Sequence, residues 1–333
     1  MPRPTSSAVH VDAALTNLSI AFLQNTSHFV AHRVFPNVPV SKQGDRYFVF
    51  DRDDFNRDEA QKRAPGTESS GSGYNLDNTP TYFADVFAHH HDIPDQVRAN
   101  ADAVIDVERA ASEYVTHKLL IRREKSWVNK FFTSGTWDND IQGVSGTPSA
   151  GQTTQWSDDA SSDPIGDIRA AKSTILENTG FEPNTLVLGQ KVMDALVDNP
   201  EIVDRIKHSG GLGNNTPAMA NERTLAALFG LERIIVAKAI ENTAKQGASG
   251  SSKFITGNKA LLCYAAPSPS LMAPSAGYTF SWQGYAGQTN QHGIATSRFR
   301  MDYLRSDRVE GEMAYDQKLI SSALGFFWDA IAA

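Results

Sequence analysis

Hydrophobic residues recur at two spacings along the chain. The segments 45–51 and 80–90, D-R-Y-F-V-F-D and P-T-Y-F-A-D-V-F-A-H-H, alternate apolar and polar residues, a period that predicts two β-strands. Between residues 100 and 132 apolar residues recur every three or four positions without Gly or Pro, and Gly135 follows. This pattern predicts one helix of about 30 residues, roughly 45 Å long.

The first 45 residues contain two short apolar patches, Ala14 to Phe22 and Phe29 to Phe35, followed by Pro36 and Pro39. Neither patch is long enough to form a core of its own. The segment is predicted to be an extended arm that lies on another surface.

The connection between the two predicted strands, residues 52–79, is rich in charge, Gly and Ser. Such a segment buries too little apolar surface to offset its ordering entropy. Together with its strands it predicts a long two-stranded arm, which is marginal alone and needs a partner surface.

A Gly/Ser/Thr-rich connector is predicted for residues 134–162, and helix and strand signals alternate after it. Asp163-Pro164 is a helix start, and Gly180 is a helix end. The alternation up to residue 266 predicts a compact α/β domain. Strands dominate from Gly277 onwards and are predicted to pack on the long helix as a second α+β unit.

Composition narrows the class of protein to which the chain can belong. The chain has 333 residues, 40% of them hydrophobic, with a net charge of -7 and a pI near 5.7. These values fit a globular protein with a substantial core. They disfavour a sequence-specific nucleic-acid-binding protein, which normally has a basic surface patch. The single cysteine, Cys263, lies in an apolar run and is predicted to be a buried, inert thiol. Neither a secretory signal nor a membrane-spanning run is evident.

Candidate chemistry is sparse. His89, His90 and His91 are consecutive at the predicted end of a strand, where alternate side chains point to opposite faces and cannot enclose one metal. Asp51, Asp53 and Asp54 lack the central Gly and the bidentate Glu of a calcium loop, and the run Asp138 to Gly143 has Ser149 at the position of that Glu. Gly210 to Gly213 lacks the Lys-Ser/Thr of a phosphate loop. No metal, cofactor or catalytic residue is predicted.

Two stretches resemble phage coat proteins. These are Arg33 to Ser69, which begins R-V-F-P-N-V-P-V, and the helix segment L-L-I-R-R-E-K-S-W-V-N-K-F-F. The order of segments over the whole chain is similar to that of the major capsid proteins of tailed bacteriophages. The resemblance implies an α+β fold with five parts: an N-terminal arm (1–45), an extended β-hairpin loop (46–92), a spine helix with the connector of the peripheral domain (93–162), an axial α/β domain (163–270) and the C-terminal strands of the peripheral domain (271–333).

The resemblance also implies a function. The chain is expected to be a structural protein, not an enzyme, that assembles with itself through pentamers and hexamers into an icosahedral shell around a phage genome. The charged residues of the extended loop are expected at the subunit interface: Asp51, Arg52, Asp53, Asp54, Arg57, Asp58, Glu59, Lys62 and Arg63.

The expected partners are further copies of the chain, a separate scaffolding protein, a portal and decoration proteins. Packaged DNA is expected to make only non-specific contact, and no membrane is involved. The expected location is the virion, after synthesis in the host bacterial cytoplasm. Two alternatives stay open: a metal- or nucleotide-dependent enzyme built on residues 163–266, or another structural virion component.

Overall fold

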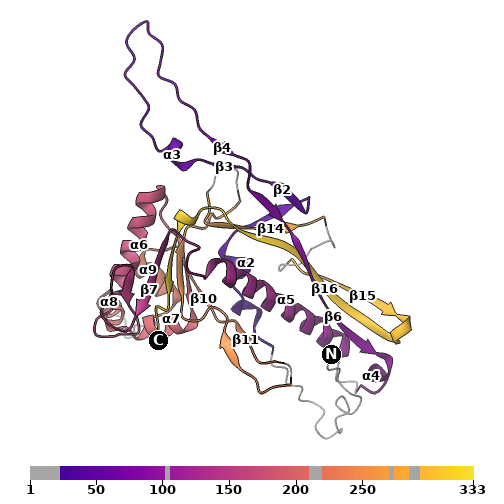
Figure 1. Ribbon diagram of the computed structural model, residues 1–333. Coiled ribbons are helices and arrows are strands. Elements are labelled where there is room, and N and C mark those ends of the chain that lie inside the picture. Colours follow the sequence, from indigo (N-terminus) through magenta and orange to yellow (C-terminus); the bar gives the residue numbers. More distant parts are fainter. Residues whose placement is uncertain (1–22, 102–105, 210–219, 246, 270–273, 285–292) are drawn as a thin grey trace.

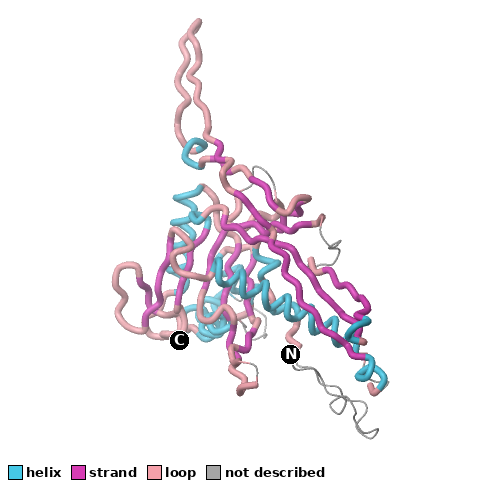
Figure 2. Tube along the Cα trace, turned by 45° about the vertical axis from the view of Figure 1, so that its right-hand side comes forward, coloured by secondary structure: helices cyan, strands magenta, loops and turns pink. Residues whose placement is uncertain are grey.

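Two β-sheets and one long helix that joins them form the body of the computed structural model, and a narrow loop projects from it (Figure 1). The structure describes residues 23–101, 106–209, 220–245, 247–269, 274–284 and 293–333. A tube view shows the same two parts, with the strand-rich unit beside the α/β unit (Figure 2). In the described ranges no helix is long and apolar enough to cross a membrane.

The α/β unit is built on a six-stranded sheet with the strand order β10-β9-β13-β17-β7-β8. In chain order its strands are β7 (Asn139–Val144), β8 (Gln152–Thr154), β9 (Thr185–Gly189), β10 (Arg233–Ala237), β13 (Ala260–Cys263) and β17 (Gly325–Asp329). Its helices are α6 (Pro164–Thr179), α7 (Gln190–Asp198), α8 (Pro200–Ser209) and α9 (Glu222–Phe229). Both faces of the sheet are buried, so its central strands are continuous apolar runs without alternation.

The strand-rich unit is a five-stranded sheet with the path β1-β14-β16-β15, in which β6 also pairs with β16. The strands are β1 (Asn37–Val40), β6 (Asp85–Pro94), β14 (Gly277–Trp282), β15 (Ala295–Met301) and β16 (Ser306–Leu319). The helix α5 (Val107–Phe131) packs on one face. Gly311 of β16 permits this contact, because a Cβ there would lie 2.7 Å from Val115 and 2.9 Å from Leu119.

The long helix α5 connects the two units. Its first half buries Val115 and Leu119 against the five-stranded sheet, and its last turns bury Trp127 and Phe131 against the six-stranded sheet. The helix is shorter than predicted. It begins after Asp106, whose carboxylate accepts hydrogen bonds from the backbone N–H groups of Glu108 and Arg109. The preceding α4 (Asp95–Ala99) is a separate short helix.

Local signals in the α/β unit produce the predicted elements. Asp163 caps α6 by accepting a hydrogen bond from the backbone N–H of Gly166 at 2.6 Å. Gly180 ends α6 in the left-handed region with φ 75°, a conformation that glycine adopts without steric cost. Pro200 behaves differently from the prediction: it ends α7 but also opens α8, since proline is well suited to the first turn of a helix.

The prediction of a coreless N-terminal arm is wrong for its second apolar patch. Phe29, Val30 and Val34 are at most 1% exposed. They belong to a segment with a 3-10 turn (Thr26–His28) and the short helix α2 (Ala31–Val34), followed by β1, which pairs in parallel with β14. The first patch, Ala14 to Phe22, lies outside the described residues.

Two further predictions are corrected. The segment 134–162 is not only a connector, because β7 and β8 extend the six-stranded sheet. The strand β17 lies between β13 and β7 in that sheet, so the assignment of all of residues 271–333 to the peripheral domain is wrong for β17. The β7–β8–β17 group therefore belongs with residues 163–266.

The predicted hairpin is present, but its pairing differs. The legs of the loop pair through β2 (Gly44–Arg46) with β5 (Thr81–Phe83), and through β3 (Val49–Phe50) with β4 (Leu76–Asp77). The second leg then enters the five-stranded sheet as β6, which pairs with β16 along its whole length. Residues 85–92 consequently belong to the sheet and not to the projecting loop. A small separate hairpin, β11 (Ile240–Asn242) and β12 (Ser252–Phe254), lies near α5.

Candidate assembly surfaces

The histidine triplet lies in the middle of β6, not at a strand end as predicted. The rings of His89 and His91 both contact Tyr114 of α5, with centroid distances of 5.9 and 5.7 Å. By strand alternation His90 points to the opposite face, where it is opposite Glu310. His89 and His91 therefore contribute to the packing between the sheet and the helix.

The other candidate cation ligands have structural partners. Asp51 caps the short helix α3 (Arg52–Phe55) by accepting from the backbone N–H of Asp53. The run Asp138 to Gly143 leads into and forms β7. Over the described ranges, no three His, Cys, Asp or Glu side chains are grouped to hold a metal ion. Gly210 to Gly213 lies outside those ranges.

Cys263 is buried, as predicted, in β13. Loss of solvent raises the pKa of its thiol to about 12. We expect negligible labelling by a maleimide under native conditions and complete labelling after unfolding, because only the exposed thiolate reacts. Mass spectrometry with and without denaturant measures this difference, and rapid native labelling would contradict the burial of this strand.

The nine charged residues predicted for the interface all lie in the projecting loop, which rises away from the body between β3 and β4 (Figure 1). Asp54 and Glu59 are partly covered, and the other seven are exposed. From residue 60 to residue 79 every residue is exposed. The loop thus presents its full length to solvent in the single subunit.

The base of the loop is closed by side chains from both legs. The Asp54 carboxylate accepts hydrogen bonds from the backbone N–H of Asn75 at 2.8 Å and from its Nδ2 at 2.9 Å. The rings of Phe50, Phe55 and Tyr74 contact one another at centroid distances of 5.5–5.9 Å. We call these five residues the collar. Phe55 and Tyr74 remain 52% and 62% exposed, so the collar also presents aromatic surface outward.

Beyond the collar the charges are only partly paired. Arg57 lies 3.6 Å from Asp54 and 3.4 Å from Glu59. Arg52 pairs with Asp53 at 3.3 Å. In the described part of the chain, no ion pair involves Asp58, Lys62 or Arg63, although the Arg63 guanidinium donates to the carbonyl of Thr67. The structure brings the charges near the collar together and leaves those at the tip available to a partner.

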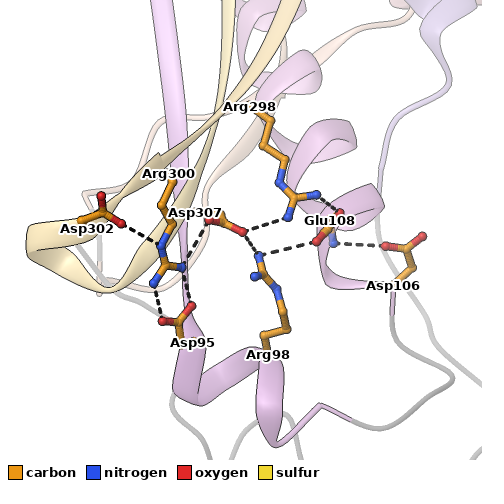
Figure 3. A network of polar contacts seen from close by, with 8 residues as sticks. All are labelled: Asp95, Arg98, Asp106, Glu108, Arg298, Arg300, Asp302 and Asp307. Carbon is orange, nitrogen blue, oxygen red and sulfur yellow. Dashed lines mark hydrogen bonds and ion pairs between the residues drawn. The ribbon is translucent and has the colours of Figure 1, made fainter.

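A second charged surface, which the sequence does not predict, lies at the far tip of the five-stranded sheet (Figure 3). Asp307 of β16 is its centre and accepts from three arginines: Arg98 at 2.5 Å, Arg298 at 2.8 Å and Arg300 at 3.3 Å. Arg300 also binds both carboxylate oxygens of Asp95. The network joins α4, β15 and β16. The feature of the sequence that could have indicated this network is the pair Arg298 and Arg300, because residues two apart in a strand lie on the same face.

Hydrogen bonds from these arginines hold the pKa of Asp307 well below its usual range. A carboxylate with a lowered pKa stabilises the fold above about pH 4, and this stabilisation is lost as the pH falls through the folded-state pKa. Asp307→Asn should therefore lower the thermal unfolding midpoint at about pH 7, and the difference from the parent should shrink at about pH 3. Asp302→Asn is the control, because that carboxylate is 93% exposed and contacts one arginine. Equal effects of the two changes would contradict a central role for Asp307.

A buried carboxylate ties the N-terminal segment to α5. Glu124 is 0% exposed, and its Oε2 accepts hydrogen bonds from the backbone N–H groups of Val30 and Ala31, each at 2.9 Å. Its Oε1 is buried and has no hydrogen-bond partner among the described residues. Burial raises the pKa of Glu124 to about 7. No pattern in the sequence indicates this contact, because Glu124 lies in a run of charged residues on a helix.

Sequence comparison relates the chain to phage capsid proteins. A family model described as phage major capsid protein E matches residues 145–273. The major capsid protein of Pseudomonas phage JBD67 is 27% identical over 329 residues, which cover 97% of this chain and 98% of that protein. The major capsid protein of Burkholderia phage BcepMu is 25% identical over 232 residues, 69% of each chain.

The fold is shared with a solved capsid. The capsid structure of the cyanophage P-SCSP1u aligns with a TM-score of 0.62 over 96% of this chain and 91% of that chain, at 12% sequence identity. The chain therefore has the tailed-phage capsid fold, as the resemblance of Arg33 to Ser69 and of the segment order implied. The prediction of fold class is confirmed.

Proposed function

We propose that this protein is a phage major capsid protein that assembles with itself into an icosahedral shell. Its fold and its two capsid relatives support this function, and the observation that carries it is the projecting loop. A segment that is exposed over its whole length gains little from the subunit's own core. Such a segment can bury surface and be stabilised when a second copy of the chain covers it.

The loop is built to reach a neighbour. The collar fixes its two legs at the point where they leave the body, which limits the directions in which the tip can point. Beyond the collar, Asp58, Lys62 and Arg63 carry charges of both signs. Charges of this kind select partner and register more than they add affinity. The nine charged residues of the loop are thus proposed as part of the subunit interface.

Copies that contact each other through different surfaces form rings when the rotation closes. A projecting loop on one side of a compact subunit gives a contact of this heterologous kind. We assign the six-stranded α/β unit to the axial position, where the subunits of pentamers and hexamers meet. The five-stranded sheet with α5 then forms the peripheral domain of each subunit.

The remaining partners follow from this role. A shell protein needs a scaffold during assembly, which a separate scaffolding protein would supply, and it needs a portal at one vertex. Decoration proteins and non-specific contact with packaged DNA complete the set. The protein would be synthesised in the host bacterial cytoplasm and would end in the virion.

An enzyme on the α/β unit has no support in the relatives, which are structural proteins. A pocket of about 230 Å³ lies between α6 and α9, and Lys172 at its wall is already engaged. Its ammonium group donates to the carbonyls of Phe229 and Gly230 and pairs with Glu182. A lysine with three oxygen partners is a structural group and a poor nucleophile.

Size-exclusion chromatography followed by electron microscopy of the purified protein tests the function. We expect capsomers or closed shells with five-fold and six-fold clusters of subunits. A monodisperse monomer at all protein and salt concentrations, with or without a scaffolding protein, would contradict it.

A further inference from the structure

The projecting loop is attached to the five-stranded sheet through two short links. The first link, residues 41–43, joins β1 to β2, and the second is the single residue Ala84 between β5 and β6. Gln43 joins the two links: its carbonyl accepts from the Ala84 N–H at 2.8 Å, and its Nε2 donates to the Ala84 carbonyl at 3.1 Å. Hinges in proteins are typically a few residues between elements, so these links define an axis about which the loop can turn.

Aromatic rings pack the paired strands β2 and β5, which we call the loop root, against β14 (Figure 1). Tyr82 of the loop root stacks on Phe280 of β14 with a centroid distance of 4.6 Å and an interplanar angle of 10°. Tyr47 lies 5.5 Å from the same ring. Ring pairs are favourable over a range of centroid distances of about 4.5–7 Å. The rings therefore hold the loop root on the sheet without defining a single direction for the loop.

A carboxylate supplies a contact with a defined direction. Asp316 of β16 lies just beyond the end of the β6 pairing, where Asp85 is opposite Tyr315. Its side chain is 9% exposed, and its Oδ2 accepts a hydrogen bond from the backbone N–H of Phe83 at 3.0 Å. Hydrogen bonds to an ionised acceptor are stronger than those between neutral groups. Because Phe83 is the last residue of β5, this bond ties the second leg of the loop to the sheet.

The same carboxylate is bound by α5. Lys130, in the last turn of the helix, donates to Oδ1 of Asp316 at 3.0 Å and to the carbonyl of Gln317 at 3.0 Å. Lys318 pairs with Oδ2 of Asp316 at 3.3 Å, but this lysine belongs to β16 itself. Asp316 therefore joins three elements: the loop root, the five-stranded sheet, and the helix whose end also packs against the six-stranded sheet.

The first leg of the loop has a separate contact with the sheet. The indole N–H of Trp282 in β14 donates to the carbonyl of Ser41 at 3.0 Å. One directional contact on each leg restricts the loop to one orientation, whereas a single contact leaves it free to turn about that point. Residues 60–79 are all exposed and give no further support. The orientation of the loop in the single subunit therefore depends on contacts at its root.

We propose that Asp316 is a positioning residue which, together with Lys130, holds the projecting loop in one direction relative to α5. Its consequence for assembly rests on the proposed function, because there the loop must point at a neighbouring subunit. A loop that samples many directions is competent to bind in only a fraction of the subunits, and the apparent affinity falls by that fraction. Because Lys130 lies on the helix that both units share, a displacement at the end of α5 is transmitted to the loop.

Distances between two spin labels on the unassembled subunit test the proposal. Asn78→Cys places one label on the loop between β4 and β5, and Glu177→Cys places the other on α6. Both positions are exposed, and Cys263 gives no background because it is buried. Double electron–electron resonance should give a narrow distance distribution for this doubly labelled parent. Asp316→Ala and Lys130→Met should each broaden the distribution, because the second leg then loses its directional contact or the link of that contact to α5.

Two variants serve as controls. Lys318→Met removes a lysine from the same carboxylate without touching α5, and it should leave the distribution narrow. Lys130→Arg keeps a cationic donor on the helix, and it should also leave the distribution narrow. Lys130 is 45% exposed, so Lys130→Met tests the proposal even if Asp316→Ala fails to fold. An unchanged distribution in Lys130→Met, or equal broadening in Lys318→Met, would overturn the proposal.

Hydrogen exchange at single-residue resolution separates the loss of this contact from unfolding of the loop root. In Asp316→Ala the Phe83 N–H should exchange about tenfold faster or more, because it loses a charged acceptor. The Ala84 N–H, which donates to the Gln43 carbonyl, should keep its protection. Equal loss of protection at both amides would show that the loop root has unfolded as a whole and would overturn the positioning role. These measurements need no shells, so a failure to assemble would count against the proposed function alone.

Discussion

Replacing residues 51–75 by Asn-Gly should abolish shell formation and leave the subunit folded. Phe50 and Leu76 are directly paired between β3 and β4, and a two-residue Asn-Gly turn is the preferred connection between such a pair. The removed residues are almost all exposed, so the core loses little. In the proposed shell, each subunit would lose the loop that reaches its neighbour, and this loss would recur at every equivalent contact.

Two measurements separate these effects. Far-UV circular dichroism and the urea unfolding midpoint should stay close to those of the parent, because the free energy of folding depends only weakly on loop length. Electron microscopy should show no shells. Normal particles from the shortened chain would show that the loop has no part in assembly, and failure to fold would show that it belongs to the core.

A matched control separates loop length from loop sequence. A Gly/Ser segment of the same length in place of residues 56–73 keeps the collar and the reach but removes the tip charges. We expect assembly to be impaired but not abolished. The reversal Arg57→Glu/Arg63→Glu should give a milder defect that depends on salt, since exposed ion pairs are each worth about 0–1 kcal/mol.

Glu124→Ala should lower the free energy of unfolding by about 3 kcal/mol, because the change leaves two buried backbone N–H groups, those of Val30 and Ala31, without an acceptor. An unsatisfied buried donor costs roughly 1–3 kcal/mol. The change also leaves a cavity beside α2. Urea unfolding of the unassembled subunit measures the loss. A loss below about 1 kcal/mol would show that the contact between Glu124 and α2 is not a main support of the N-terminal segment.

The isosteric change Glu124→Gln keeps an acceptor oxygen and is the control. It should also remove a pH dependence. The pKa of Glu124 is raised from 4.5 to about 7 in the fold, so the folded state holds a proton that the unfolded state releases between these values. The contribution of this group is therefore full below about pH 4.5 and is lost as the pH rises toward about 7. From about pH 5 to about pH 8 the parent should lose up to roughly 3 kcal/mol relative to Glu124→Gln. A constant difference would show that Glu124 does not titrate in this range.

The elements with strong local signals could be predicted from the sequence. The helix α6 has its cap at Asp163 and its left-handed glycine at Gly180, and the buried strands β9 and β13 are short apolar runs between turns. These signals depend on neighbouring residues alone. The projecting loop was also predictable, because its composition excludes a core.

Features that depend on distant partners were not predictable. The strands β7 and β8 contain Gly and Thr in place of apolar runs. They form strands because β7 pairs with β17, and β8 in turn pairs with β7. Residues 29–35 are buried because Glu124 and the end of α5 hold them. At the candidate interface, the charges of the loop were evident in the sequence. The closure of its base by Asp54 and Asn75 was not, because these residues are far apart along the chain.

The position of β17 has a consequence for biosynthesis. This strand occupies an interior place in the six-stranded sheet, paired with β13 on one side and β7 on the other. While the ribosome has not passed residue 329, β7 and β8 have no edge to join, and the apolar faces of β13 and of the last turns of α5 stay uncovered. The six-stranded sheet therefore closes only after β17 has been synthesised. Chains that stop before β17 leave this gap between β13 and β7 and cannot complete the six-stranded sheet.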